Sequence, residues 1–201
     1  MGAGERLGHD GLHEQRSRNA KILFHRFLIH TLLILLTLPV VFSCRHVYYT
    51  DSRGNVVDAR AAQYFNEGLA YAKKGQHDQA IAAYTKAIEI EPTNADMYCG
   101  RGASYTVKGP YDQAIADFTK AIELDPRHAK AYFLRGLVWR RKGNFDKAIA
   151  DFTKAIELDP KMADAYYNRA VTWYDKGDYR KADADHAKAI ELDPNVDEDN
   201  D

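Results

Sequence analysis

The sequence of 201 residues has little of several features that would each indicate a particular class of protein. It has only two cysteines, Cys44 and Cys99, which are too few for the disulfide framework of a small secreted domain. A formal net charge of −1 argues against a nucleic-acid-binding protein that works by bulk electrostatic attraction. Hydrophobic residues make up 45% of the chain, which is enough for a packed core and argues against a disordered chain.

Proline is also scarce, and the spacing of the six prolines indicates a repeated unit. Four of them, Pro92, Pro126, Pro160 and Pro194, are 34 residues apart, and so are Gly75, Gly109, Gly143 and Gly177. Helix-breaking residues at a fixed interval of about 20 to 50 residues indicate an array of stacked units. Alignment on the prolines divides residues 61–196 into the units 61–94, 95–128, 129–162 and 163–196.

Equivalent places of the four units hold similar side chains. The fourth place holds Tyr64, Tyr98, Tyr132 and Tyr166, the eighth Gly68, Gly102, Gly136 and Ala170, and the eleventh Tyr71, Tyr105, Trp139 and Trp173. The twentieth and twenty-seventh hold only alanine, and the twenty-fourth holds Tyr84, Phe118, Phe152 and His186. The pattern resembles the tetratricopeptide repeat (TPR), with Glu or Arg in place of the usual Leu at the seventh place. The resemblance implies an all-α, right-handed superhelical solenoid of four helix pairs.

Physical arguments agree with this resemblance. The aromatic and small residues of a unit recur at helical spacing and predict amphipathic helices. Gly75 and its equivalents suit the left-handed C-terminal end of the first helix. Asp78, Asp112 and Asp146 suit the start of the second helix, where a carboxylate meets unpaired N–H groups. One helix pair cannot bury its own apolar face, so neighbouring units must stack.

The fourth unit departs from the other three. Ile81, Ile115 and Ile149 are replaced by Asp183, and the aromatic residue of the twenty-fourth place is replaced by His186. A terminal unit lacks a neighbour on one side and needs a more polar face there. The sequence therefore predicts that the array ends at this unit.

The N-terminal residues 1–44 have the pattern of an export or anchor segment. A leader with five basic and three acidic residues precedes the apolar run Phe27–Ser43, which at 17 residues is near the lower limit for crossing a bilayer. The run followed by Cys44 resembles a bacterial lipoprotein signal peptide, in which that cysteine is lipidated. An uncleaved signal anchor and a cleaved, lipid-free signal are the alternatives. The basic leader predicts that the repeats lie beyond the membrane, in the periplasm or outside the cell.

Two short segments flank the repeats. Residues 45–60 form a linker, and its turn sequence Asp51-Ser52-Arg53-Gly54 fits either a small hairpin or an extended tether. The acidic tail, residues 197–201, is expected to be a solvated end.

The first helices are the expected binding surface. The segments Asp112–Pro126 and Asp146–Pro160 differ at one position, whereas the first helices of the same units share far less. In TPR proteins the first helices line the concave groove that holds a partner. The resemblance places there Phe65, Asn66, Leu69, Asp96, Cys99, Thr106, Lys130, Phe133, Leu134, Leu137, Arg140, Arg141, Asp164, Tyr167, Asn168, Val171 and Tyr174. These side chains suit an amphipathic helix or extended peptide with an acidic residue near Arg140 or Arg141; the alternative is that this pair is only a solvated helix end.

Other chemistry has little support in the sequence. The set of Lys, Arg and Asn with which chaperone-binding TPR proteins hold a carboxylate is matched only by Lys130, since Leu69, Gly100 and Leu134 occupy the other places. We find no catalytic or metal-ligating pattern, and we expect no cofactor and no nucleic-acid partner. The sequence predicts a membrane-tethered, non-catalytic interaction scaffold. The alternative is an assembly subunit that oligomerises through its convex face or array ends.

Overall fold

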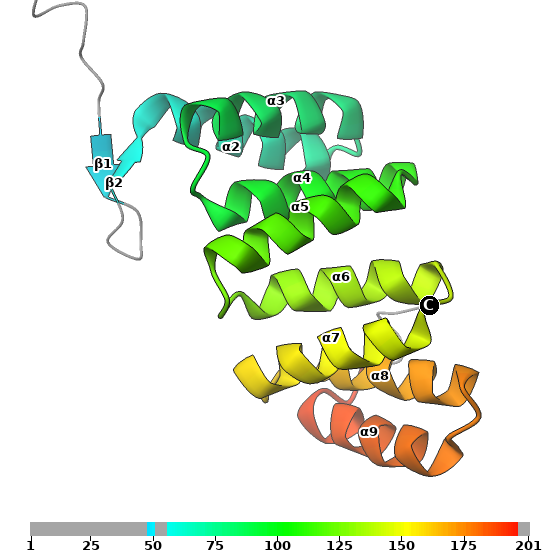
Figure 1. Cartoon of the computed structure of the whole chain (residues 1–201). Helices are drawn as coiled ribbons and strands as arrows, with labels where there is room; N and C mark the ends of the chain where they lie inside the picture. The colour runs from blue at the N-terminus through cyan, green and yellow to red at the C-terminus, as the bar shows by residue number, and fades with distance from the viewer. Residues whose placement is uncertain (1–47, 51–55, 197–201) are drawn as a thin grey trace, which may run out of the picture. The chain divides into compact units, whose positions relative to one another are not determined.

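The computed structural model describes residues 48–50 and 56–196 (Figure 1). The expected export segment with Cys44 and the acidic tail lie outside the described residues. Among the helices that the structure describes, none is both long and apolar enough to cross a membrane.

A two-stranded hairpin precedes the helices. Strand β1 (Tyr48–Thr50) pairs antiparallel with β2 (Val56–Asp58), with Tyr48 opposite Asp58. Of the two conformations that fitted the linker sequence, the described part therefore adopts the hairpin. Asp58 also begins the first helix, because its buried side chain accepts a 2.8 Å hydrogen bond from the backbone N–H of Arg60. The strand thus leads into the array without a flexible break.

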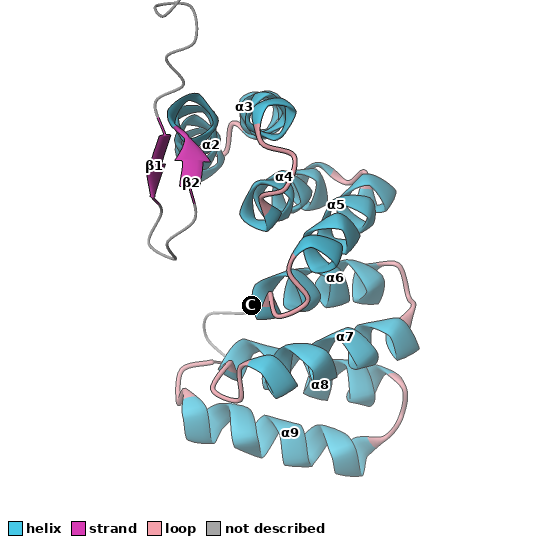
Figure 2. Cartoon of the chain, turned by 60° about the vertical axis from the view of Figure 1, so that its left-hand side comes forward, coloured by secondary structure: helices cyan, strands magenta, loops and turns pink. Residues whose placement is uncertain are grey.

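Eight helices follow in four pairs. The pairs are α2 (Ala59–Lys73) with α3 (His77–Ile90), α4 (Ala95–Lys108) with α5 (Tyr111–Leu124), α6 (Ala129–Arg141) with α7 (Phe145–Leu158), and α8 (Ala163–Asp175) with α9 (Tyr179–Leu192). Each helix packs against its pair mate, and the helices of the first three pairs also contact the first helix of the next pair, so the pairs follow one another along the array (Figures 1 and 2). The predicted solenoid of four helix pairs is confirmed.

The glycines at the 34-residue interval form the turns within the pairs. Gly75, Gly109, Gly143 and Gly177 have φ angles of +73°, +99°, +73° and +83°, the left-handed region that L side chains rarely adopt. The prediction for these positions is confirmed.

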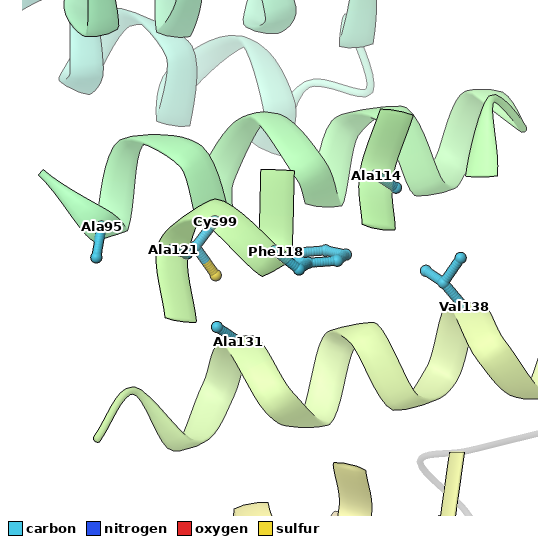
Figure 3. Packing of buried hydrophobic residues seen from close by; sticks show 7 residues of the cluster. All are labelled: Ala95, Cys99, Ala114, Phe118, Ala121, Ala131 and Val138. Atoms are coloured by element: carbon cyan, nitrogen blue, oxygen red, sulfur yellow. The ribbon is translucent and has the colours of Figure 1, made fainter. Parts of the chain in front are cut away.

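Inside each of the first three pairs, a large aromatic ring of the second helix packs against a glycine of the first helix. A Cβ atom added to Gly102 would lie 2.9 Å from the ring of Phe118, and one added to Gly136 would lie 2.8 Å from the ring of Phe152. Both rings are fully buried. Figure 3 shows the ring of Phe118, which belongs to α5, between α4 and α6. Ala131 and Val138 of α6 point toward α5. The core is therefore continuous from one unit to the next, as stacking requires.

Candidate partner-binding surface

The first helices form one side of the array. Contacts join α2 with α4, α4 with α6, and α6 with α8, in addition to the contacts between sequential helices. Because the first helices of successive units touch each other, they lie on the inner side of the curved array. The side chains of the first helices that point away from the second helices therefore form one continuous surface, which we call the inner surface.

Arginine clamps hold each of the last three helix pairs together. The Nε and Nη2 atoms of Arg135 on α6 donate 2.8 Å hydrogen bonds to the two carboxylate oxygens of Asp151 on α7. Arg101 pairs in the same way with Asp117, and Arg169 with Asp185. These charged groups are largely buried. Burial of either charge alone would destabilise the fold, so the two are found as a hydrogen-bonded pair. Hydrogen bonding to the partner carboxylate raises the pKa of the Arg135 guanidinium above its usual value.

The same arginines also connect consecutive units. Nη1 of Arg135 donates a 3.0 Å hydrogen bond to the hydroxyl of Thr119 on α5. In the same way, Arg101 donates to Thr85, and Arg169 donates to Thr153. Each guanidinium also lies 5.7–5.8 Å from the tyrosine ring of the fourth place in its own helix. The clamp therefore fixes the angle within a pair and the contact between pairs.

A second series of ion pairs crosses the junctions, by which we mean the contacts between a second helix and the first helix of the next unit. Lys108, Lys142 and Lys176 pair with Asp78, Asp112 and Asp146 of the preceding unit. We expected these aspartates at the start of the second helices, and each lies in the first turn of its helix. The N-cap residues are Gln76, Pro110 and Asn144, and the aspartates that follow them have a lysine as partner. The aspartates still suit the helix dipole.

Three of the four expected groove aromatics belong partly to the core. Phe65, Phe133 and Tyr167 are half-buried, and their rings lie 5.7, 5.9 and 6.2 Å from Tyr84, Phe152 and His186 of their own units. Leu137 is also half-buried, and Leu134 packs against the core cluster around Phe118. These side chains are part of the packing of their own units and are only partly exposed at the inner surface.

Arg140 lies in a polar cluster between α6 and α8. Its Nε is 3.4 Å from an oxygen of Asp175, and its Nη1 donates a 3.3 Å hydrogen bond to the side-chain oxygen of Asn168. Asn168 is buried and donates a 2.9 Å hydrogen bond to the backbone carbonyl of Asp164. Arg140 and Asn168 thus already have partners within the chain, and they brace α6 against α8.

Of the other expected residues, Asp96, Thr106 and Val171 are half-buried, and several face solvent more openly. Asn66, Lys130 and Arg141 are exposed, Leu69 is 38% exposed and Tyr174 is 63% exposed. Tyr174 makes an edge-to-face contact with Tyr179, with ring centroids 5.1 Å apart. The inner surface therefore presents scattered apolar groups together with two unburied cations.

Cys99 lies inside this surface rather than on it. It is 5% exposed, and burial raises the pKa of its thiol to about 12. The thiol is therefore protonated near neutral pH and serves as a packing group. Among the residues that the structure describes, no cluster of His, Cys, Asp and Glu could hold a metal ion.

The clamps are structural contacts that we did not predict from the sequence. Their signal was present, since Arg at the seventh place and Asp at the twenty-third occur together in units two to four. Both are missing together in the first unit, which has Glu67 and Ala83 there. Two charged places sixteen residues apart that change together would have indicated a contact between the paired helices.

Comparison with protein families agrees with this architecture. Three models match, described as TPR repeat for residues 68–109 and as tetratricopeptide repeat for residues 104–163 and 163–196. The chain belongs to the tetratricopeptide repeat family. No curated protein sequence matches this TPR chain significantly.

Solved structures with this fold include other TPR proteins. A crystal structure of MamA is 27% identical with a TM-score of 0.64, over 69% of this chain and 81% of that one. The first TPR of Spaghetti (RPAP3), bound to the HSP90 peptide SRMEEVD, is 25% identical with a TM-score of 0.59, over 61% of this chain and 99% of that one. The Arabidopsis OM64 TPR domain is 26% identical with a TM-score of 0.52, over 66% and 95%.

Proposed function

We propose that this TPR chain is a non-catalytic scaffold that holds a peptide or helix of a partner protein against its inner surface. The observation that carries the proposal is the contact between successive first helices, which joins their varied side chains into one surface. The second helices α5 and α7, by contrast, have nearly the same sequence. Individual side chains on a shared framework are what selective recognition requires.

The partner segment is expected to be partly apolar and to carry an acidic residue. Leu69 and Tyr174 are exposed apolar anchors, and Lys130 and Arg141 are exposed cations on the same series of helices. Arg140 is already engaged by Asp175 and Asn168, so Arg141 is the better partner for an incoming carboxylate. Burial of the apolar groups supplies affinity, and the charges set the register.

The neighbour with a bound HSP90 peptide supports peptide binding by this fold, but the peptide must differ here. Leu69, Gly100 and Leu134 stand where chaperone-binding TPR proteins need Asn or Arg, and Leu134 packs against the core. The inner surface therefore lacks hydrogen-bond donors that a ligand with a bound terminal carboxylate would need.

A crosslinking experiment tests the scaffold. A photoreactive amino acid at Leu69 captures the partner in cells, and Arg141→Glu reduces the captured amount about tenfold by reversing the charge that meets the acidic residue. Lys120→Glu, an exposed charge reversal on the second helix α5, is the matched control and leaves capture unchanged. Equal capture by all three proteins would contradict binding at the inner surface. A monomeric solution mass separates this function from the alternative of an assembly subunit, which oligomerises without a partner.

We also propose that the N-terminal segment tethers the repeats to a membrane as a lipoprotein. The support is the apolar run Phe27–Ser43 with Cys44 directly after it and a basic leader before it. Cys44→Ser then abolishes the mass increase from the lipid and releases the repeats into the periplasmic fraction. An unchanged mass with unchanged membrane association would instead favour an uncleaved signal anchor.

A further inference from the structure

The last helix pair has an open cavity where the other pairs have a neighbour. Tyr167, Val171 and Tyr174 of α8 and Asp183 and His186 of α9 line a cavity of about 340 Å³. In the preceding units the equivalent space is filled by the next first helix. Gly100 of α4 lies against the Tyr84 ring, and Ala131 and Val138 of α6 point toward α5 and Phe118 (Figure 3). In the part of the chain that the structure describes, no helix follows α9.

The ion pairs at the junctions indicate which side chains a helix would need in this space. At each of the three junctions, an aspartate of the second helix pairs with a lysine at the C-terminal end of the next first helix or directly after it. The equivalent of Asp78, Asp112 and Asp146 in α9 is Arg180, which is exposed. A helix that docks on α9 therefore needs an acidic residue at the place of Lys142, the residue that directly follows α6.

A second departure from the other units occurs one turn along α9. Asp183 replaces an isoleucine, and the equivalent Ile115 packs in the same cluster as Val138 of the following first helix. Asp183 is exposed at the cavity, and its carboxylate has no hydrogen bond or ion pair among the described residues. A docked helix therefore needs a basic residue where α6 has Val138, four residues before the place of Lys142.

The rest of this surface is apolar. Tyr174 is 63% exposed, Tyr179 is 57% exposed and Ile190 is 39% exposed. Solvation alone explains the two charged replacements but not this group of exposed apolar side chains beside them. We call the surface formed by Tyr167, Tyr174, Arg180, Asp183 and Ile190 the end face.

A second copy of this chain does not match the end face. If α2 of another copy stacked on α9 as α6 stacks on α5, Lys74 would meet Arg180, because Lys74 is the equivalent of Lys142. Ala70 would stand opposite Asp183 and offer no cation, and Gln63 would replace the buried Ala131. Like charges and a buried amide disfavour this contact.

We propose that the end face docks an amphipathic helix of a different protein, which carries a basic residue and, one turn later, an acidic residue beside its apolar stripe. The basic residue meets Asp183, the acidic residue meets Arg180, and the apolar stripe covers Ile190 and the tyrosines. The end face is a second binding site that adjoins the inner surface and shares Tyr167 and Tyr174 with it, and it completes the array as a fifth first helix would.

Two labelled peptides test the charge order. The first has the sequence of residues 129–142, AKAYFLRGLVWRRK, and the second carries Val138→Lys and Lys142→Glu in the same sequence. Binding to the full-length chain in detergent is followed by fluorescence anisotropy. The changed peptide binds about tenfold more tightly, because two ion pairs replace one repulsive contact and one unpaired carboxylate.

A variant of the protein provides the matched control. Arg180→Asp with Asp183→Ile restores the residues of the interior junctions, so the preference reverses and the unchanged peptide binds more tightly. Equal binding, no binding of either peptide, or a preference that does not reverse would each overturn the proposal and leave the end face as a solvated cap. Arg141→Glu on the inner surface leaves the preference unchanged; if it abolished the preference, the peptide would lie in the groove and the end face would be rejected.

Discussion

Arg135 and Asp151 lie sixteen residues apart and join α6 to α7 through two 2.8 Å hydrogen bonds. The same guanidinium reaches back to Thr119 in the preceding unit. One side chain thus sets two interfaces, within its own pair and with the pair before it. Because this arrangement recurs at Arg101 and Arg169, the geometry of the inner surface rests on three equivalent polar contacts.

Asp151→Ala destabilises the array strongly. The change leaves the Arg135 guanidinium largely buried without its carboxylate, so the free energy of unfolding falls by about 3 kcal/mol. Urea denaturation followed by circular dichroism measures the loss. Asp112→Ala removes an exposed aspartate that pairs with Lys142 and costs less than about 1 kcal/mol. If the two variants were equally stable, the clamp would have no special role.

Thr119→Val separates the contact between units from the contact within a unit. The valine keeps the shape of the side chain but removes the hydroxyl that accepts from Arg135, and the expected cost is about 1 kcal/mol. The Arg135–Asp151 pair stays intact in this variant. A loss as large as that of Asp151→Ala would show that the hydroxyl, rather than the carboxylate, dominates the clamp.

Gly136→Ala is destabilising, although alanine is normally the better helix residue. Its Cβ would lie 2.8 Å from the buried Phe152 ring, and this crowding costs about 1–3 kcal/mol, which exceeds the gain in helix propensity of about 1 kcal/mol. Ala170→Gly is the reverse change at the equivalent place of the fourth unit and is also destabilising, because it loses helix propensity and a buried methyl group. Thermal unfolding compares the two, and a more stable Gly136→Ala would contradict the close packing.

Cys99 resists alkylation in the folded protein. Burial raises the pKa of the thiol to about 12, so the thiol is almost entirely protonated at pH 8, and the sulfur is also shielded from reagent. Iodoacetamide treatment and peptide mass mapping follow this site separately from Cys44. Modification becomes complete in denaturant. Rapid modification of the native protein would show that the inner surface opens at α4.

Asp183→Ile with His186→Phe increases self-association. These changes give α9 the apolar side chains that the other second helices bury at their junctions, and the end face becomes an uncovered apolar surface. Sedimentation velocity at several concentrations measures the effect, with the unchanged protein as control. If both proteins remained monomeric, the polar residues at 183 and 186 would not serve as a cap.

The fold was predictable because its determinants are local and repeated. The prolines at intervals of 34 residues and the glycines with positive φ mark the unit and turn boundaries, and neither depends on distant contacts. The clamps were harder to predict, since residues sixteen apart meet only after both helices have formed and packed. Asn168 shows the same limit. Its place suggested an exposed groove residue, but the approach of α6 to α8 buries it beneath Arg140.

Attachment on one side has a kinetic consequence for the last unit. The pair α8–α9 is held to the array at a single junction, through Arg169 to Thr153 and Lys176 to Asp146. An interior pair must break two junctions to open, so α9 frays more often than α5 or α7 and its amide protons exchange faster. A helix bound at the end face supplies the missing second junction. The partner then determines how long the terminal pair stays closed, as well as whether the end face is occupied.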